Sequence, residues 1–169
     1  ADRMNILAID TSSKYFSLVI ARDDKILVKI HRPLGRELSR LIIPSIEKAL
    51  KKAGLSLRSI DYFGVGLGPG SFTGLRVGLA TIKGFTFALK KPIVGVGSLD
   101  VIAQAIKDKV GLVCSLVDAR RSLVYSAIYR FKDDRLKRKS RYSLIGIKEL
   151  LRSVKGNTVF TGDGLTLYG

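Results

Sequence analysis

The stretch of the chain best suited to chemistry is GLGPGSFTGLRVG, residues 66–78, because glycine-rich turns before helices commonly hold phosphates. Two standard phosphate-binding patterns are nevertheless excluded. A P-loop requires a Lys-Ser or Lys-Thr pair, and none follows Gly74. A dinucleotide fingerprint requires a third glycine, where Thr73 stands, and an acidic residue near position 94, where none lies.

What these exclusions leave is a turn from a strand into a helix, formed around Gly68 and Gly70. The first N–H groups of such a helix, together with its dipole, make a generic anion site. Ser71 or Thr73 is expected to cap the same helix end. The two interpretations are compatible.

Two further glycines, Gly74 and Gly78, stand four residues apart on one face of the predicted helix. Glycine inside a helix costs about 1 kcal/mol relative to alanine, so we expect a compensating close approach. The neighbour would be another helix, from the same fold or from a second subunit. Arg76 lies on a different face and could contact a carboxylate or a phosphate.

The residues that usually bind metals or act as nucleophiles are scarce. Cys114 is the only cysteine and His31 the only histidine, which excludes an internal disulfide and a His–His metal pair. Cys114 lies in LVCSLV, which predicts a buried strand residue. No Ser-His or Cys-His constellation is visible, which argues against a protease.

Composition indicates a folded chain with one core, or two half-size lobes. Of the 169 residues, 46% are hydrophobic and 26% are charged, and the net charge is +16. This charge favours a polyanionic partner such as RNA, or an acidic protein surface, but a lysine-rich solvated surface from a heat-tolerant host explains it equally well. No run is long enough for a membrane span and the first residues lack the hydrophobic stretch of a signal peptide, so we expect a cytoplasmic protein. Residues 1–3 read as a remnant of recombinant expression.

The elements that position these residues follow from hydrophobic periodicity. In the first part we expect strands over 5–10, 15–21, 25–30, 60–68 and 92–98, with helices over 36–53, 74–89 and 99–108. Pro44 is expected to kink the first helix, and Ser98 to cap the third.

The same order then begins again. We expect strands over 110–118, 123–131, 135–144 and 157–164, with a helix over 147–154. The repeat is one of element order only, because the two halves share no sequence identity. It predicts an α/β protein of two lobes, 4–109 and 110–169.

Four segments together resemble one family, the TsaB (YeaZ) family of tRNA threonylcarbamoyladenosine biosynthesis proteins. They are MNILAIDTSS near the start, GLGPGSFTGLRVG, SLVDARRSLVY at 115–125 and TGDG at 161–164. The resemblance covers residues 4–169. It implies the actin, sugar-kinase and Hsp70-like fold, with two ribonuclease-H-like lobes that each open βββαβα. Family members are usually longer, so the resemblance also implies a short or truncated C-terminal lobe.

In this fold an active ATPase carries a phosphate motif in its first hairpin, where this chain has Asp10, Thr11 and Ser12. Ser12 replaces a glycine that would let the backbone approach phosphates, so the resemblance implies a vestigial nucleotide site. Asp118 and Asp163 would face the cleft of the fold and contact a ligand or partner. The alternative, which we favour, is turn chemistry, with Asp118 bonding its own backbone and Gly162 and Gly164 at positive φ.

The resemblance further implies a non-catalytic subunit without metal or cofactor of its own, with ATP or ADP possible at a partner interface. It would form a homodimer alone and act with TsaD-like and TsaE-like subunits on tRNA adenosine 37, while its own contact with tRNA is left open. The expected interface uses helices 36–53 and 74–89 through Leu38, Ile42, Gly74, Arg76, Gly78 and Ile82. The competing hypotheses are an ATPase or kinase that uses Asp10 and the glycine loop and, remotely, a glycoprotease-like peptidase.

Overall fold

The computed structural model describes residues 3–33, 35–106, 111–133 and 135–167. The chain forms two compact units, Ala1–Leu67 with Ser71–Val96, and Gly68–Gly70 with Gly97–Gly169. The division therefore falls earlier in the chain than the predicted boundary at 109. Helix α3 (Ser98–Gln104) accounts for the difference, because its Leu99 and Ala103 pack into the core of the second unit.

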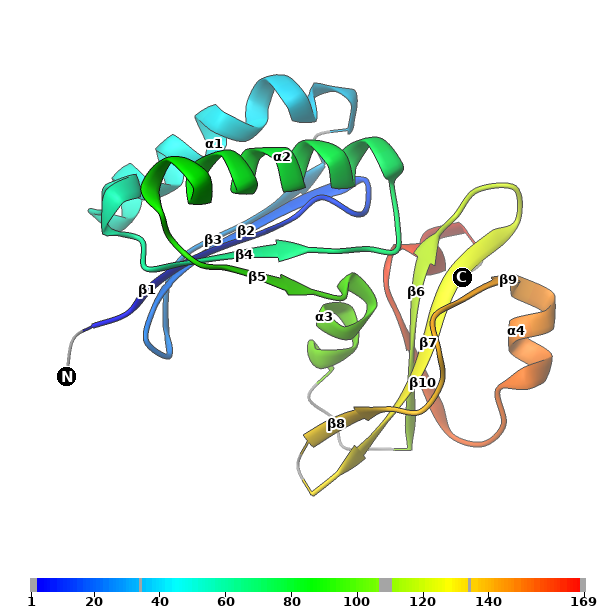
Figure 1. Ribbon diagram of the computed structural model, residues 1–169. Helices are drawn as coiled ribbons and strands as arrows, with labels where there is room; N and C mark the ends of the chain where they lie inside the picture. The colour runs from blue at the N-terminus through cyan, green and yellow to red at the C-terminus, as the bar shows by residue number, and fades with distance from the viewer. Residues whose placement is uncertain (1–2, 34, 107–110, 134, 168–169) are drawn as a thin grey trace. The chain divides into compact units, whose positions relative to one another are not determined.

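The first unit is a five-stranded sheet in the order β3-β2-β1-β4-β5 (Figure 1). Strands β1, β2 and β3 form an antiparallel meander, and β4 and β5 extend it in parallel from β1. The elements are β1 (Asn5–Asp10), β2 (Tyr15–Arg22), β3 (Lys25–Pro33), η1 (Gly35–Glu37), α1 (Leu38–Ala53), η2 (Leu57–Ser59), β4 (Tyr62–Gly66), α2 (Phe72–Leu89) and β5 (Ile93–Val96).

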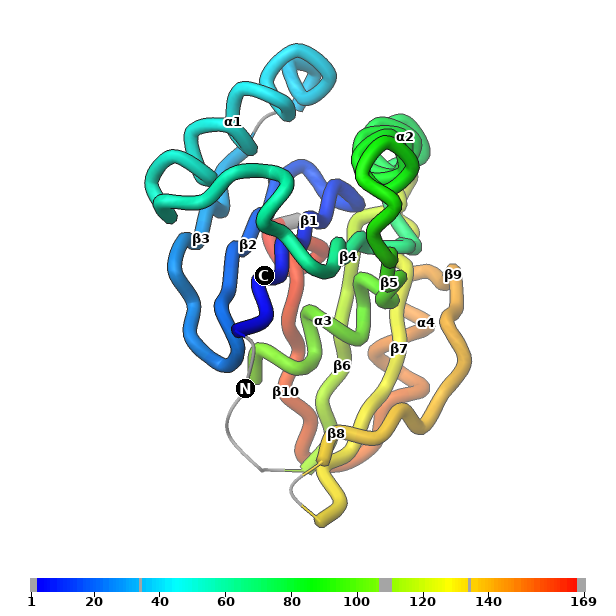
Figure 2. The backbone as a smooth tube through the Cα atoms, turned by 60° about the vertical axis from the view of Figure 1, so that its left-hand side comes forward, coloured from blue at the N-terminus to red at the C-terminus, as the bar shows by residue number. Residues whose placement is uncertain are grey.

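Helices α1 and α2 cover one face of this sheet (Figures 1 and 2). The apolar stripe of α1 is buried as its periodicity predicted, with Ile42 and Ile46 in the core. Alternate residues of the strands, such as Leu7 and Ile9 of β1, supply the other side of that core. Gly54 ends α1 at a φ of +66°, a left-handed conformation that glycine adopts without strain.

The second unit is built on a sheet in the order β10-β6-β7-β8, to which β9 adds by pairing with β7. Its elements, after α3, are β6 (Leu112–Asp118), β7 (Leu123–Lys132), β8 (Arg135–Arg138), β9 (Ser143–Gly146), α4 (Ile147–Ser153), β10 (Thr158–Thr161) and η3 (Asp163–Leu167).

The central strand β6 is buried on both faces. Val113 and Val117 pack with α3, while Cys114 and Leu116 join a separate cluster with Leu150 of α4. A strand covered on both faces reads as a continuous apolar run, as LVCSLV does. The predicted burial of Cys114 is confirmed.

The two units repeat one topology, which confirms the expected duplication. Strand β6 corresponds to β1, since each pairs antiparallel with the next strand and parallel with the strand that follows a helix. The predicted α/β fold of two ribonuclease-H-like units is therefore confirmed. In the second unit, the described residues after β10 form the 3-10 helix η3.

Several local predictions were wrong. The strand expected over 135–144 is two strands, because Ile128 of β7 donates its N–H to the Ser140 hydroxyl (2.9 Å) and accepts from the Lys139 N–H (2.7 Å). Gly97, not Ser98, is the N-cap of α3. The strand expected over 157–164 ends at Thr161, and the end of the helix expected over 99–108 lies partly outside the described residues. No helix in the described part of the chain is long and apolar enough to cross a membrane.

Candidate functional site

The glycine face of α2 lies against the end of β1, in the same unit. Thr11 is buried, and its hydroxyl donates to the carbonyl oxygen of Gly74 (2.8 Å). A Cβ on Gly74 would overlap the Thr11 carbonyl oxygen, and a Cβ on Gly78 would overlap the Thr11 hydroxyl. The close neighbour is therefore Thr11, the residue that follows β1, and not another helix. Gly74 and Gly78 are buried rather than available to a partner.

In the turn into α2, backbone N–H groups form hydrogen bonds within the first unit. Ser71 is the N-cap, as predicted, and its hydroxyl accepts the Gly74 N–H (3.2 Å) while its carbonyl accepts the Leu75 N–H (2.8 Å). The Ser71 N–H in turn donates to the Ser12 carbonyl (2.6 Å). Thr73 is exposed and is not the cap. These bonds leave fewer donors for an anion than the sequence suggested.

The remaining loop residues belong to the second unit. Gly68 has a φ of +82° and precedes a cis peptide bond to Pro69, and Gly70 follows. The Gly68 N–H donates to the Ser98 hydroxyl (3.1 Å), and the Ser98 N–H donates to the Gly68 carbonyl (2.9 Å). The Ser98 hydroxyl thus fixes the glycine turn instead of capping α3.

The candidate nucleotide turn at the end of β1 is closed by its own side chains. One carboxylate oxygen of Asp10 accepts both the Ser12 N–H (2.8 Å) and the Ser12 hydroxyl (2.6 Å). Ser12 is buried. A phosphate could reach the N–H or the hydroxyl of Ser12 only by breaking these bonds, so the residues of this turn do not fit a phosphate cradle.

In the second unit, Asp118 and Asp163 are linked to each other through the backbone. Asp163 accepts the Asp118 N–H (3.2 Å), and Asp118 accepts the Arg120 N–H (2.7 Å). This is the turn chemistry expected of Asp118. Gly162 has a φ of +116°, as expected, but Gly164 lies in η3 without a positive φ.

The predicted interface residues fall into two groups. Ile42 and Ile82 are fully buried in the core of the first unit, and Leu38 packs against that core. Arg76 is exposed on α2, with its guanidinium 3.8 Å from the ring centroid of Phe72. Of the six residues, Arg76 alone is exposed.

The exposed side of α2 carries a stripe of residues that was not predicted from the sequence. Phe87 is 89% exposed and Phe72 67% exposed, which is unusual for aromatic side chains. Among the described residues, no atom beyond the local helix backbone lies within 4 Å of the place of a Cβ on Gly84. We call this stripe the outward face of α2; its members are Phe72, Arg76, Leu79, Ala80, Lys83, Gly84 and Phe87. The sequence did contain a pattern that could have predicted this face, because apolar residues recur on both sides of this helix.

Other candidate residues have structural roles. His31 of β3 stacks on Tyr15 (ring centroids 4.7 Å apart), and its Nδ1 lies 2.8 Å from the Ser17 hydroxyl. Burial raises the pKa of the Cys114 thiol to about 11. Among the described residues no group of three His, Cys, Asp or Glu side chains could hold a metal ion.

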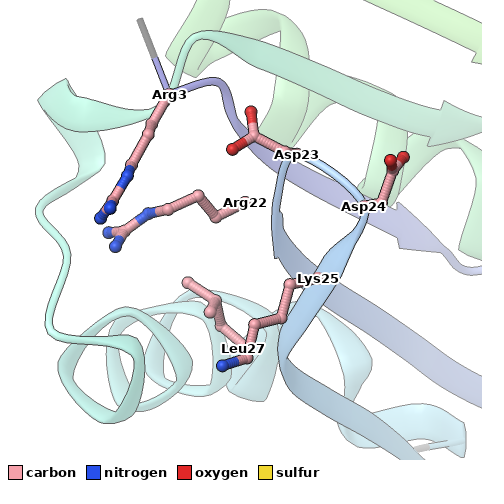
Figure 3. A pocket seen from close by; sticks show the side chains of 6 residues that line it. All are labelled: Arg3, Arg22, Asp23, Asp24, Lys25 and Leu27. Carbon is pink, nitrogen blue, oxygen red and sulfur yellow. The ribbon is translucent and has the colours of Figure 1, made fainter. Parts of the chain in front are cut away.

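A pocket of about 650 Å³ lies at the β2–β3 turn (Figure 3), and its lining includes none of the predicted site residues. Its lining comes from the start of the chain and from the turn itself, and consists of Arg3, Arg22, Asp23, Asp24, Lys25 and Leu27. Asp23 already accepts the Met4 N–H and Arg22 donates to Asn5, so these contacts serve to fix the turn.

Comparison with known proteins identifies the family. The family model described as TsaD, tRNA N6-adenosine threonylcarbamoyltransferase, matches residues 27–161. The chain belongs to the TsaD family. Among its curated relatives is the tRNA threonylcarbamoyladenosine biosynthesis protein TsaB of Bacillus subtilis, 29% identical over 98% of this chain and 73% of that protein. TsaB of Escherichia coli is 37% identical over 75% of this chain and 55% of that protein.

The structure of YeaZ from Pseudomonas aeruginosa has the same fold. Its TM-score is 0.85 at 23% identity, over 96% of this chain and 78% of that one. These relatives confirm the TsaB (YeaZ) resemblance within the TsaD family. The chain spans little more than half the length of the E. coli protein.

Proposed function

We propose that this chain is a non-catalytic, activating subunit of a complex that makes threonylcarbamoyladenosine in tRNA. In this proposal a TsaD-like subunit transfers the threonylcarbamoyl group from its adenylate to N6 of adenosine 37, in tRNAs that read codons beginning with A. A TsaE-like ATPase joins the assembly, and any ATP or ADP binds at the partner interface. The names of the relatives, which concern this modification, support the assignment.

The observation that carries the proposal is the outward face of α2. Phe72 and Phe87 lie about four helical turns apart, with the small residues Ala80 and Gly84 between them. Small residues let a second helix approach closely, and exposed aromatic side chains mark contact surfaces. This face would bind the TsaD-like partner, or a second copy of the chain when the partner is absent.

The closed turn at Asp10 supports the non-catalytic part of the proposal. Ser12 uses its N–H and hydroxyl on Asp10, which leaves the turn poorly suited to phosphate. His31, the only histidine, is engaged with Tyr15 and Ser17. The chemistry of the transfer would then belong to the partner.

The decisive experiment is reconstitution of tRNA modification from a TsaD-like subunit, a TsaE-like subunit and the enzyme that makes the adenylate. We expect product only when this chain is present. Phe87→Glu should abolish partner binding and product formation, because it places a charge in an apolar contact. Ile26→Glu is the matched control, since Ile26 is also an exposed apolar side chain (59%) but lies on β3. Unchanged product formation without the chain would contradict the proposal.

Calorimetry with Mg-ATP distinguishes the proposal from the ATPase or kinase hypothesis. A scaffold subunit should bind ATP weakly or not at all, and Asp10→Ala should leave modification by the complex unchanged. Tight binding that Asp10→Ala removes would favour the enzyme hypothesis instead.

A further inference from the structure

The β7–β8 hairpin carries four cations on one face. Arg130 pairs directly with Lys137 across the two strands, and Lys132 pairs directly with Arg135. Residues two apart on a strand point to the same side, so the four side chains form a two-by-two grid. We call Arg130, Lys132, Arg135 and Lys137 the basic face, and all four are exposed.

The opposite face of the hairpin is the structural one. Phe131 and Leu136 pack against the core that includes Tyr129. Arg138 also lies on that side, where it pairs with Asp100 (3.5 Å). Asp100 in turn accepts the Tyr129 hydroxyl (2.7 Å). One face of the hairpin therefore packs against the core of the unit, and the basic face makes no such packing contacts.

The basic face is electrostatically unfavourable in the isolated protein. Like charges directly opposite each other on neighbouring strands destabilise a sheet. In the described part of the chain, no carboxylate forms an ion pair with any of the four. Both views show the hairpin extending past the end of α4 (Figures 1 and 2), which agrees with the exposure of the four side chains.

We propose that the basic face binds the phosphate backbone of tRNA. An array of four long cationic side chains matches successive phosphates and releases their counterions, which gives affinity without base specificity. The choice of RNA over an acidic protein rests on the proposed function, in which tRNA is the substrate of the complex. The net charge of +16 would assist the approach of any polyanion but does not by itself select this face.

The test is binding of unmodified tRNA to the full chain, measured by fluorescence anisotropy over a range of salt concentrations. The variant R130Q/K132Q/R135Q/K137Q should bind at least about tenfold more weakly at 0.1 M salt, and the slope of log K against log salt should fall by about 3. The matched control is K25Q/K29Q/K51Q/K52Q, which removes the same charge from exposed lysines of β3 and α1. This control variant should change the slope of log K against log salt only slightly.

Folding of the test variant is checked by its urea midpoint, which should equal or exceed that of the wild type because two like-charged pairs are removed. Equal tRNA binding and equal slopes for the test and control variants would overturn the proposal. Poly-L-glutamate is the second probe, and binding it as tightly as tRNA through the same four residues would point to an acidic protein instead.

The outcome for the basic face is separable from that for the proposed function. If the test variant binds tRNA more weakly as expected but the reconstituted modification does not need the chain, the proposed function is wrong and the proposal for the basic face is supported. If the modification requires the chain but the test variant binds tRNA normally, the proposal for the basic face is wrong and the proposed function is supported.

Discussion

Thr11 holds α2 close to β1 through two different atoms. Its carbonyl oxygen lies against Gly74 and its hydroxyl against Gly78, while that hydroxyl also bonds the Gly74 carbonyl. The glycines therefore serve the packing of one unit. Thr11 could not be recognised from sequence as the neighbour of these glycines, because it is more than sixty residues from Gly74 in the chain and no local pattern links them.

Gly78 and Gly84 make a matched pair for measuring this contact. Gly78→Ala should lower the free energy of unfolding by about 1–3 kcal/mol, because the new methyl group meets Thr11 in a packed site. Gly84→Ala on the same helix should raise it by about 1 kcal/mol, since the position is open and alanine favours the helix. Urea denaturation gives both values, and a stabilising Gly78→Ala would show that the contact is not tight.

Cys114 is a single thiol with a raised pKa, and its reactivity reports on the second unit. At pH 8 a thiol with a pKa of about 11 is almost wholly protonated, and it is also fully buried. We expect alkylation by iodoacetamide to be slow in the native protein and to become fast in urea. Rapid alkylation without denaturant would mean that β6 is accessible in the folded state.

At the scale of elements, Asp61 fixes the start of the parallel pair β1–β4. It accepts the Asn5 N–H (2.8 Å) and contacts the Lys91 ammonium (3.4 Å). The hydrogen bond from Asn5, and then Lys91, hold the pKa of Asp61 below its ordinary value of 3.8. Because the folded pKa is the lower one, this stabilisation is present above about pH 4 and is lost as pH falls through the folded pKa.

Asp61→Asn should therefore destabilise the protein at pH 7, by about 1 kcal/mol or less because the carboxylate is partly exposed. The difference between variant and wild type should shrink as the pH is lowered from 5 to 2. Urea midpoints across this range test it, with Asp24→Asn on the exposed β2–β3 turn as the control. A difference that stays constant with pH would exclude the carboxylate as its cause.

Elements with a strong hydrophobic periodicity were predicted well, whereas elements whose limits are set by tertiary contacts were not. The apolar stripe of α1 and the apolar run of β6 were sufficient to predict where these two elements lie in the chain. The segment after Arg138 continues the strand pattern in sequence, yet Ser140 bonds Ile128 of β7 and interrupts it. The outward face of α2 was not predicted, because the interface expected on this helix was placed mainly on the glycine face, with Gly74, Gly78 and Ile82.

At the scale of the whole molecule, element order was sufficient to predict the duplicated fold, because both units repeat a meander, a helix and a parallel strand. Charge was not sufficient to predict a site. The excess of basic residues is spread along the chain, and only the pairing of β7 with β8 shows that four of them share one face. Strand register is a long-range property, which composition cannot reveal.

The same excess charge predicts how the stability of the molecule depends on salt. With 30 basic and 14 acidic side chains, the folded state carries a large positive charge that repels itself, and the like charges opposed on the hairpin add to this repulsion. Sodium chloride should therefore raise the urea midpoint, most steeply up to about 0.15 M, where the screening length has fallen to about 8 Å. The R130Q/K132Q/R135Q/K137Q variant should show a smaller rise than the wild type. A midpoint that falls with added salt would mean that favourable ion pairs outweigh this repulsion in the folded state.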